Sequence, residues 1–551
     1  MNKGSTGVWW RDAITYQVYI RSFADSNGDG KGDVEGIREK LPYLKRLGID
    51  AIWITPWYPS PQKDHGYDVA DYMDIEPDYG ILADAERLIK ETHEHGIRII
   101  IDVVPNHTSD QHHWFQEALN SSPGSAARDR YIFRDGRGPN GDLPPNNWEA
   151  VFGGPAWQRI TEKDGKPGQW YLHLFAVEQP DLNWQNEEVR DHFRQVLRFW
   201  LDKGVDGFRI DVAHGMVKAE GLPDVEQSSE LMSKFVMPYW DQEGVHEIYR
   251  DWRKILDSYP GDRMAVAEAW APNSERLARY IRPDELANSF NFAFLDCKWN
   301  ASEFKSVIDE SVAAVSSVGA PASWVINNHD VTRSVVRYDR DLKGGGIRNI
   351  EERYGDMSAF NLERGLRRAR AGALLMLALP GGAYIYQGEE LGLPEVTDIP
   401  RDRLTDPRWK MSGYKDPGRD GCRVPLPWTV REDGAHGFSS NISLNRSDSW
   451  LPQPAWWGEF ACERQDEDEN STLAMYRRAL SIRHEIPEFG DGTMEWISAD
   501  AHHLAFRRGH FECWVAFDKT ISLPENVHVL LSSSPIEGSL IPADTAVWLR
   551  R

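Results

Sequence analysis

Short apolar runs alternate with longer amphipathic segments along most of the chain. Residues 97–104 are almost entirely apolar, which is typical of a strand buried on both faces of a parallel sheet. Residues 33–47 instead repeat isoleucine and leucine at helical spacing and predict a helix. The runs that predict strands are residues 13–20, 51–55, 97–104, 207–212, 264–267, 290–295, 324–327 and 383–386.

Helical sequence generally follows these eight strands, as at residues 83–95 and 187–203. An α/β chain that alternates in this way favours a (β/α)8 TIM barrel, in which each helix returns the chain to the next parallel strand. A doubly wound open sheet has the same periodicity and stays open as the alternative.

Two regions depart from this alternation. Residues 108–179 are rich in Gly, Pro, Asn and Trp, and they predict a subdomain inserted after the third strand. A helix at 472–484 is followed by strand-like alternation at 503–507, 511–517 and 527–531, which predicts a small C-terminal antiparallel β-domain. We therefore expect a barrel formed by residues 1–107 and 180–488, an inserted subdomain at 108–179 and a C-terminal domain at 489–551.

Charge and cysteine content narrow the classes of partner and compartment. With 63 basic and 86 acidic residues the net charge is −23, and such a surface repels nucleic acid and anionic lipid. We expect neither as a partner. Four widely spaced cysteines without a CxxC pair, no apolar signal segment near residue 1 and no membrane-length apolar run predict a cytoplasmic protein. Monomer and homodimer stay open.

Polar clusters follow four of the predicted strands. They lie in DVVPNH (102–107), GFRIDVAH (207–214), VAEAW (266–270) and INNHD (326–330). Barrel enzymes place their catalytic groups at the carboxyl ends of the strands. Helix capping alone is a poor explanation for carboxylates and histidines gathered at four such ends, so we expect an active site there.

Two of these carboxyl groups suit the cleavage of a glycosidic bond. That reaction needs one carboxylate to attack the anomeric carbon and one carboxylic acid to protonate the leaving oxygen. Glu268 has apolar sequence neighbours, which favour a raised pKa and the role of acid. Asp211 follows Arg209 by two residues on the same strand face, where a cation would keep a nucleophile ionised. A structural ion pair inside the barrel is the alternative for Arg209 and Asp211.

The four motifs, in this order, resemble those of the α-amylase superfamily of retaining glycoside hydrolases, and the resemblance covers nearly the whole chain. QPDLNW at 179–184 resembles a marker of the α-glucosidase and oligo-1,6-glucosidase branch. The resemblance implies that Asp211 is the nucleophile and Glu268 the acid/base. It further implies that Asp330 is a third carboxylate, which binds two sugar hydroxyls more tightly in the transition state.

The resemblance also implies a set of substrate-binding residues: Tyr67, Asp68, His107, Phe152, Phe175, Arg209, His329 and Arg419. Within this set, Arg209 orients the nucleophile and both histidines bind hydroxyls of the same sugar. We expect Asp68 to grip the non-reducing end of that sugar. An ion pair between Asp68 and Arg419 would close the far end of the pocket.

A second candidate site is the loop DSNGDGKGD at 25–33. Oxygen ligands at alternating positions fit a hard cation such as Ca²⁺ or Mg²⁺, and a similar loop occurs in glucosidases of the family that the chain resembles. The loop is not an EF-hand, because its twelfth position is Gly36. We expect a structural cation and no organic cofactor; turns without metal are the alternative. The expected ligands are Asp25, Asn27, Asp29, the Lys31 carbonyl and Asp33.

Together these features predict a retaining, exo-acting α-glucosidase that acts on short α-glucosides of the maltose or isomaltose type, with sucrose as a further candidate substrate. A transglucosylase or sucrose isomerase with the same residues is the first alternative, and a non-catalytic carbohydrate-fold protein is a distant one. Val212 follows the nucleophile, as often accompanies α-1,6 cleavage, but the adjoining AHGMVK departs from the usual oligo-1,6-glucosidase pattern. The sequence therefore favours neither cleavage of α-1,4 linkages nor cleavage of α-1,6 linkages.

Overall fold

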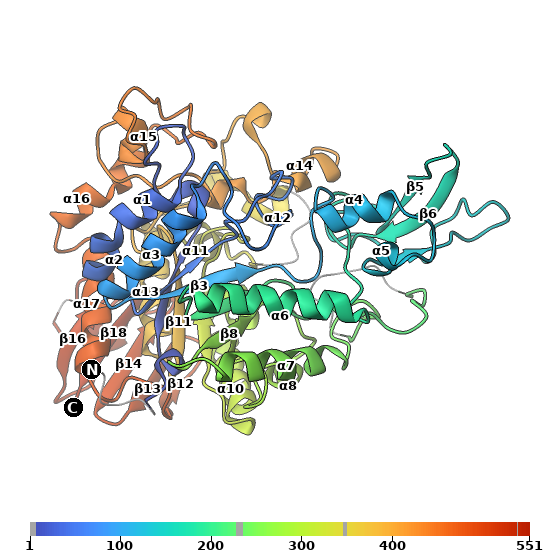
Figure 1. The fold of residues 1–551 in the computed structure, drawn as a ribbon. Coiled ribbons are helices and arrows are strands. Elements are labelled where there is room, and N and C mark those ends of the chain that lie inside the picture. Colours follow the sequence, from blue (N-terminus) through green and yellow to red (C-terminus); the bar gives the residue numbers. More distant parts are fainter. Residues whose placement is uncertain (1–6, 227–234, 345–349, 537) are drawn as a thin grey trace.

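A parallel sheet of eight strands forms the centre of the molecule (Figure 1). The structure is a computed structural model, and it describes residues 7–226, 235–344, 350–536 and 538–551. The strand order is β10-β11-β1-β2-β3-β7-β8-β9, and every pairing in it is parallel. In sequence order the strands are Ile14–Val18, Ala51–Ile54, Arg98–Val103, Gly207–Ile210, Met264–Ala267, Asn288–Ser289, Ser323–Val325 and Gly382–Tyr386.

The barrel core explains why these strands read as unbroken apolar runs. Every residue of β2, β7, β8 and β11 is buried, because one strand face packs inside the barrel and the other beneath helices. Helix α3 (Leu82–Glu94) follows β2. Helices α6 (Glu187–Asp202) and α7 (Val245–Asp257) lie before and after β7, and α10 (Ala301–Ser317) precedes β10. The α/β alternation thus forms the (β/α)8 barrel that the sequence predicts.

The predicted sixth strand, residues 290–295, is wrong throughout, because the observed strand ends just before it. The strand β9 covers only Asn288–Ser289, and Phe292–Asp296 form a helix, α9. The Asn291 side chain accepts the backbone N–H of Phe294 and caps this helix, which turns the chain away from the sheet. A short apolar run fits a buried helix as well as a buried strand, so periodicity could not separate the two.

The predicted helix 33–47 is two helices, α1 (Val34–Glu39) and α2 (Leu41–Leu47). Pro42 lies in the first turn of α2, where a missing N–H costs nothing, but it could not continue α1. The helix 472–484 is present as α17 (Thr472–Glu485).

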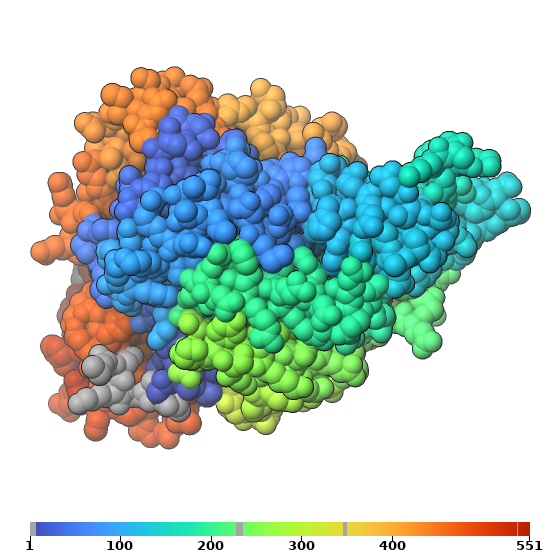
Figure 2. Space-filling model, in the orientation of Figure 1, coloured from blue at the N-terminus to red at the C-terminus, as the bar shows by residue number. Residues whose placement is uncertain are grey.

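Besides the barrel sheet, the described residues form a three-stranded, a five-stranded and a two-stranded sheet. Between β3 and β7 the chain forms α4 (His113–Leu119), α5 (Ala126–Asp129) and a three-stranded antiparallel sheet, which project from the barrel in Figures 1 and 2. Its strands are β4 (Phe133–Arg134), β5 (Trp157–Thr161) and β6 (Pro167–Leu172).

The C-terminal sheet is antiparallel and packs on the barrel through helix α13 (Leu362–Ala378), where the Trp548 indole donates to the Leu374 carbonyl. Its order is β12 (Glu495–Ala499), β13 (His503–Arg508), β14 (Phe511–Ala516), β18 (Thr545–Arg550) and β16 (His528–Ser532). The predicted residue boundaries between the three parts stay predictions. Within the described residues, helices are too short or too polar to span a bilayer.

Candidate active site

Arg209 is the centre of a buried ion-pair cluster at the carboxyl ends of β3, β7 and β8. Its Nη1 atom lies 2.7 Å from Asp102 Oδ1 and 2.6 Å from Asp211 Oδ1. Its Nη2 atom lies 2.8 Å from Glu268 Oε2. One guanidinium therefore contacts both carboxyl groups that the sequence singles out, and it fixes them close to each other.

One cation faces three carboxyl groups in this cluster, and the pKa shifts of Asp211 and Asp102 reflect that imbalance. Burial raises the pKa of Asp211, Arg209 opposes this rise, and Glu268 adds to it. Burial likewise raises the pKa of Asp102 to about 7. The sequence predicts that Arg209 keeps Asp211 ionised; the influence of Arg209 has that sign, but burial and the neighbouring carboxylates outweigh it.

Val212 holds Glu268 through its backbone. The Val212 N–H donates to Glu268 Oε2 over 3.0 Å, and the φ angle of Val212 is +45°. A β-branched residue is strained in this left-handed region, so the surrounding packing must hold it there. The side chain packs with Phe152 and Phe175 of the inserted region. No pattern in the sequence signals this backbone conformation.

His329 and Asp330 follow β10 and face Tyr67. The His329 ring stacks on the Tyr67 ring with 5.4 Å between centroids, and His329 Nε2 hydrogen-bonds with the Tyr67 hydroxyl at 2.7 Å. Asp330 Oδ1 accepts from Arg419 (3.1 Å) and from Arg423 (2.9 Å). Burial acts to raise the pKa of Asp330, but His329, Arg419 and Arg423 together hold that pKa below its usual range. Asp330 is therefore an ionised carboxylate.

The expected ion pair between Asp68 and Arg419 is absent, and this prediction from the sequence is wrong. Arg419 Nη2 lies 2.7 Å from Asp64 Oδ1, and its Nε atom lies 2.6 Å from Asp406. Asp68 accepts the backbone N–H groups of Lys63 and Asp64 instead, so it shapes the loop. Both aspartates lie within five residues of each other, and only the course of the backbone decides which one faces Arg419.

Aromatic residues of the inserted region complete one wall of the site. The His107 ring lies 5.2 Å from the Phe175 ring, and Phe175 lies 5.8 Å from Phe152. The Arg419 guanidinium lies over the Phe152 ring at 5.3 Å. These contacts join the inserted region to the strand ends, so the structure brings together every substrate-binding residue predicted from the sequence except Asp68.

Two further charged residues of the site, Asp64 and Arg423, were not predicted from the sequence. Asp64 precedes the predicted Tyr67 by three residues, and Arg423 follows the predicted Arg419 by four. Lys218 was not predicted either; it is a buried lysine whose ammonium lies 2.8 Å from Asp181 and donates to Asn106 Oδ1 at 2.9 Å. Lys218 thus ties the segment after the nucleophile to the motifs at 102–107 and 179–184.

The loop at 25–33 is closed by hydrogen bonds between its own side chains and backbone. Asp25 accepts from the backbone N–H groups of Gly28 and Gly30, and Asp33 accepts from Ser26 and Gly36. Among the described residues no group of three or more His, Cys, Asp or Glu side chains has the arrangement of a metal site. A cation there would depend on amide and carbonyl oxygens as well, as the expected ligand set does.

The fold and the site define a glycoside hydrolase built on a (β/α)8 barrel. The model of the alpha amylase catalytic domain matches residues 17–492, and the chain belongs to this alpha-amylase family.

Relatives and solved structures agree with this assignment. A trehalose-6-phosphate hydrolase of Bacillus subtilis is 36% identical over 89% of this chain and 86% of its own length. An oligo-1,6-glucosidase of Parageobacillus thermoglucosidasius is 36% identical over 90% of this chain and 87% of its own. The trehalulose synthase of Pseudomonas mesoacidophila is similar in structure, with a TM-score of 0.83, 30% identity and coverage of 98% and 99%. An alpha-glucosyl transfer enzyme superposes with a TM-score of 0.83 at 33% identity, covering 99% of this chain and 100% of its own.

Proposed function

We propose that the protein is a retaining, exo-acting α-glucosidase that releases glucose from the non-reducing end of short α-glucosides. The observation that carries the proposal is the shared contact of Arg209 with Asp211 and Glu268, at 2.6 and 2.8 Å. Retaining glycosidases need their two carboxyl groups close together, at about 5 Å, whereas inverting enzymes hold them further apart to admit a water molecule. Two carboxylates on one guanidinium favour the retaining arrangement.

The mechanism has two displacements at the anomeric carbon. An Asp211 oxygen bonds to the anomeric carbon while the bond between this carbon and the glycosidic oxygen breaks. Glu268 gives its proton to the departing oxygen. Glu268 then takes a proton from water. The water oxygen bonds to the anomeric carbon, the bond to Asp211 breaks, and glucose leaves with its original configuration.

Asp330 and the histidines bind the sugar while charge develops on its ring. Asp330 has a side chain that is 30% exposed, against 7% for Asp211, so its carboxylate is open to hydroxyl groups of a ligand. His107 and His329 both contact Tyr67: the His329 ring stacks on the Tyr67 ring, and His107 Nε2 lies 3.2 Å from the Tyr67 carbonyl oxygen. Hydrogen bonds that shorten as the sugar ring flattens stabilise the transition state more than the bound substrate, so they lower the activation barrier.

Exo-action rests on the closed end of this site. Arg419 joins Asp64, Asp330 and the Phe152 ring, so one layer of charged and aromatic side chains lies beyond the first sugar. A chain that continued past the non-reducing end would have to displace a buried ion pair, which is costly. The site therefore favours terminal glucose units.

The test is product analysis on maltose, isomaltose and sucrose, with the anomer of released glucose followed by NMR. Hydrolysis with retention gives α-glucose first, and β-glucose as the first product would refute the mechanism. The comparison across linkages decides between α-1,4 and α-1,6, for which Val212 and its neighbours give opposite indications.

A transglucosylase or sucrose isomerase is the second candidate. It is favoured by the likeness to the trehalulose synthase and to the alpha-glucosyl transfer enzyme. Both reactions share the covalent intermediate, and only the acceptor differs. New disaccharides as the main product from sucrose, with little free glucose, would select this candidate.

We also propose that the loop at 25–33 binds a structural Ca²⁺ or Mg²⁺ and that the protein acts in the cytoplasm. Asp25, Asn27, Asp29, Asp33 and the Lys31 carbonyl would supply oxygen ligands, the type that both ions prefer. Burial raises the pKa of Asp33, a penalty that a bound cation would offset. Cytoplasmic location is supported by the four cysteines, which are all buried as free thiols.

A further inference from the structure

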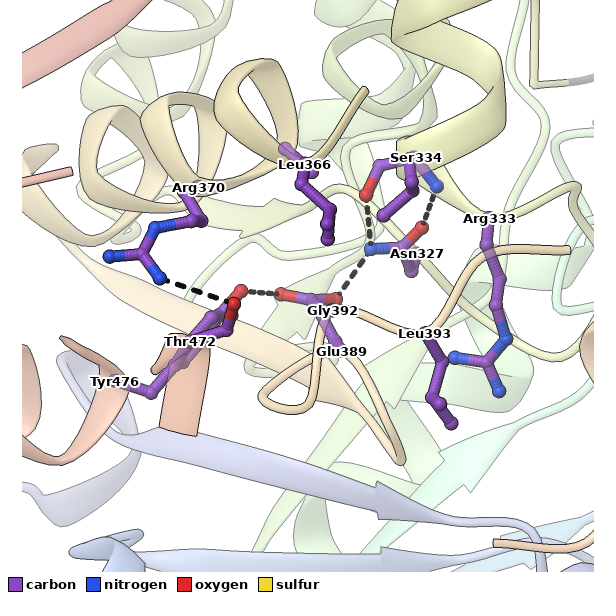
Figure 3. A pocket seen from close by; sticks show the side chains of 12 residues that line it. Asn327, Arg333, Ser334, Leu366, Arg370, Glu389, Gly392, Leu393, Thr472 and Tyr476 are labelled. Atoms are coloured by element: carbon purple, nitrogen blue, oxygen red, sulfur yellow. Dashed lines mark hydrogen bonds between the residues drawn. The ribbon is translucent and has the colours of Figure 1, made fainter. Parts of the chain in front are cut away.

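A buried polar network beneath the site connects Glu389 to the loop that carries His329 and Asp330. Glu389 follows β11, and its Oε2 atom accepts the Asn327 side-chain amide at 2.8 Å. Its Oε1 atom accepts the Tyr476 hydroxyl of α17 at 2.7 Å. Figure 3 shows these contacts around a cavity of about 10 Å³, scarcely the space of one water molecule.

Asn327 closes the base of that loop. Its Oδ1 atom accepts the backbone N–H of Ser334 at 2.6 Å, and Ser334 is the first residue of α11 (Ser334–Arg340). Residues 328–333 are therefore a loop whose two ends meet at one side-chain amide. Two partners fix the orientation of this amide: the Ser334 N–H requires the oxygen on its side, and the Glu389 carboxylate accepts the NH2 group on the other.

Arg333, at the other end of the loop, is also held by the chain that follows β11. The Arg333 backbone N–H donates to Glu395 at 2.9 Å, and the Arg333 guanidinium donates to the Gln387 carbonyl at 3.0 Å. Both ends of the segment that presents Asp330 are thus held by the chain that follows β11. Neither Glu389 nor Glu395 faces the sugar site, and the proposed mechanism uses neither.

We propose that Glu389 is a positioning residue, which sets the place of Asp330 by holding Asn327. The proposal rests on the proposed glucosidase function, in which Asp330 grips the sugar in the transition state. A displacement of about 1 Å in such a group lowers a rate by about 100-fold without removing any contact to substrate. The charged neighbours of Glu389 are Arg333 and Arg370 in the cavity wall and Glu390 next in sequence.

The experiment exchanges donor and acceptor within the pair. In Asn327→Asp, two carboxyl groups face each other, and they hold together only while they share a proton. We expect kcat on an aryl α-glucoside to fall about tenfold at pH 8 and less at pH 5, with KM changed by less than about threefold. In the double variant Asn327→Asp/Glu389→Gln, the new amide donates to the carboxylate introduced at position 327, and kcat returns to within about threefold of the wild type.

Tyr476→Phe is the matched control, because it removes a hydrogen bond to Glu389 without touching Asn327. We expect its kcat to stay within about threefold of the wild type. A second readout is the affinity for a cationic iminosugar, which resembles the transition state; Asn327→Asp should weaken it by the same factor as kcat. Melting temperatures identify variants that are merely less stable.

Three outcomes would overturn the proposal: a double variant no more active than Asn327→Asp, a defect independent of pH, or full iminosugar affinity in Asn327→Asp. If the variants are too unstable to assay, a comparison of Glu389→Gln with Glu389→Leu decides: Glu389→Gln must keep activity within about threefold, and Glu389→Leu must lose it. A wild-type protein inactive on every α-glucoside would instead refute the proposed function, so the two failures are distinguishable.

Discussion

Arg419 forms its ion pair with Asp64, at 2.7 Å, although Asp68 lies only four residues further along the same loop. Arg419 also contacts Asp330 at 3.1 Å, so a single guanidinium links Asp64 to the carboxylate that we propose binds the sugar. Asp68 points into the loop and accepts two backbone N–H groups. The two aspartates therefore have separate partners: Asp64 pairs with Arg419, and Asp68 accepts hydrogen bonds from the loop backbone.

The first prediction separates these two aspartates. Asp64→Asn leaves Arg419 short of a buried partner, and we expect kcat/KM on maltose or isomaltose to fall by about 30-fold or more. Asp68→Asn should leave kcat/KM within about threefold, because its side chain does not reach the sugar site. Steady-state kinetics at pH 7 measures both. The reverse ranking would show that Asp68 is the sugar-binding residue after all.

The second prediction assigns the two catalytic carboxyl groups. Asp211→Asn should lower kcat about 10⁴-fold or more on every substrate, because the covalent step disappears. Glu268→Gln should lower hydrolysis of disaccharides far more than cleavage of a nitrophenyl α-glucoside, whose leaving group departs without a proton. The ratio of the two rates is the measurement. An equal loss on both substrates would contradict the assignment of Glu268 as the acid.

The third prediction concerns the pH dependence of stability. Burial raises the pKa of Asp68 to about 7, from about 4 in an unfolded chain. Between these values the folded state binds more protons than the unfolded state. The stabilising contribution of protonated Asp68 is thus complete below about pH 4 and is lost as pH rises through about 7.

The comparison of wild type with Asp68→Asn isolates this contribution. Buried histidines act in the opposite direction over part of the same range, since the pKa of His112 and that of His214 are lowered to about 3 by burial. The contributions of these histidines to the pH dependence are the same in both proteins, so they cancel in the comparison. Urea unfolding from pH 5 to pH 8 should show the wild type losing free energy of unfolding relative to the variant. Parallel curves would mean that Asp68 titrates normally.

The fourth prediction tests the cation site. Removal of a structural ion by a chelator should lower the melting temperature, and Ca²⁺ or Mg²⁺ should restore it in a concentration-dependent way. Asp29→Ala should abolish the response, whereas Asp71→Ala, an exposed aspartate in a different loop, should keep it. Elemental analysis should find one divalent ion per chain. A chelator-insensitive melting curve in the wild type would show that the loop is held by its internal hydrogen bonds alone.

The sequence by itself determined the class of fold and the residues at its strand ends. Buried parallel strands require continuous apolar runs, so seven of the eight barrel strands were visible as such. The chemistry of a (β/α)8 barrel must follow these runs directly, which placed Arg209, Asp211, Glu268 and Asp330 by their position in the chain. The sixth strand was misread because residues 290–295 carry no signal that separates a short buried strand from the helix α9.

Only the tertiary structure decided which of these residues meet. Asp64 and Asp68 lie four residues apart in one loop, and the course of the backbone directs Asp64 toward Arg419 and Asp68 toward the loop backbone. Asn327 and Glu389 are 62 residues apart, and their contact arises because neighbouring barrel strands end side by side. A local pattern encodes burial and periodicity, whereas the pairing of charges depends on which strands become neighbours in space.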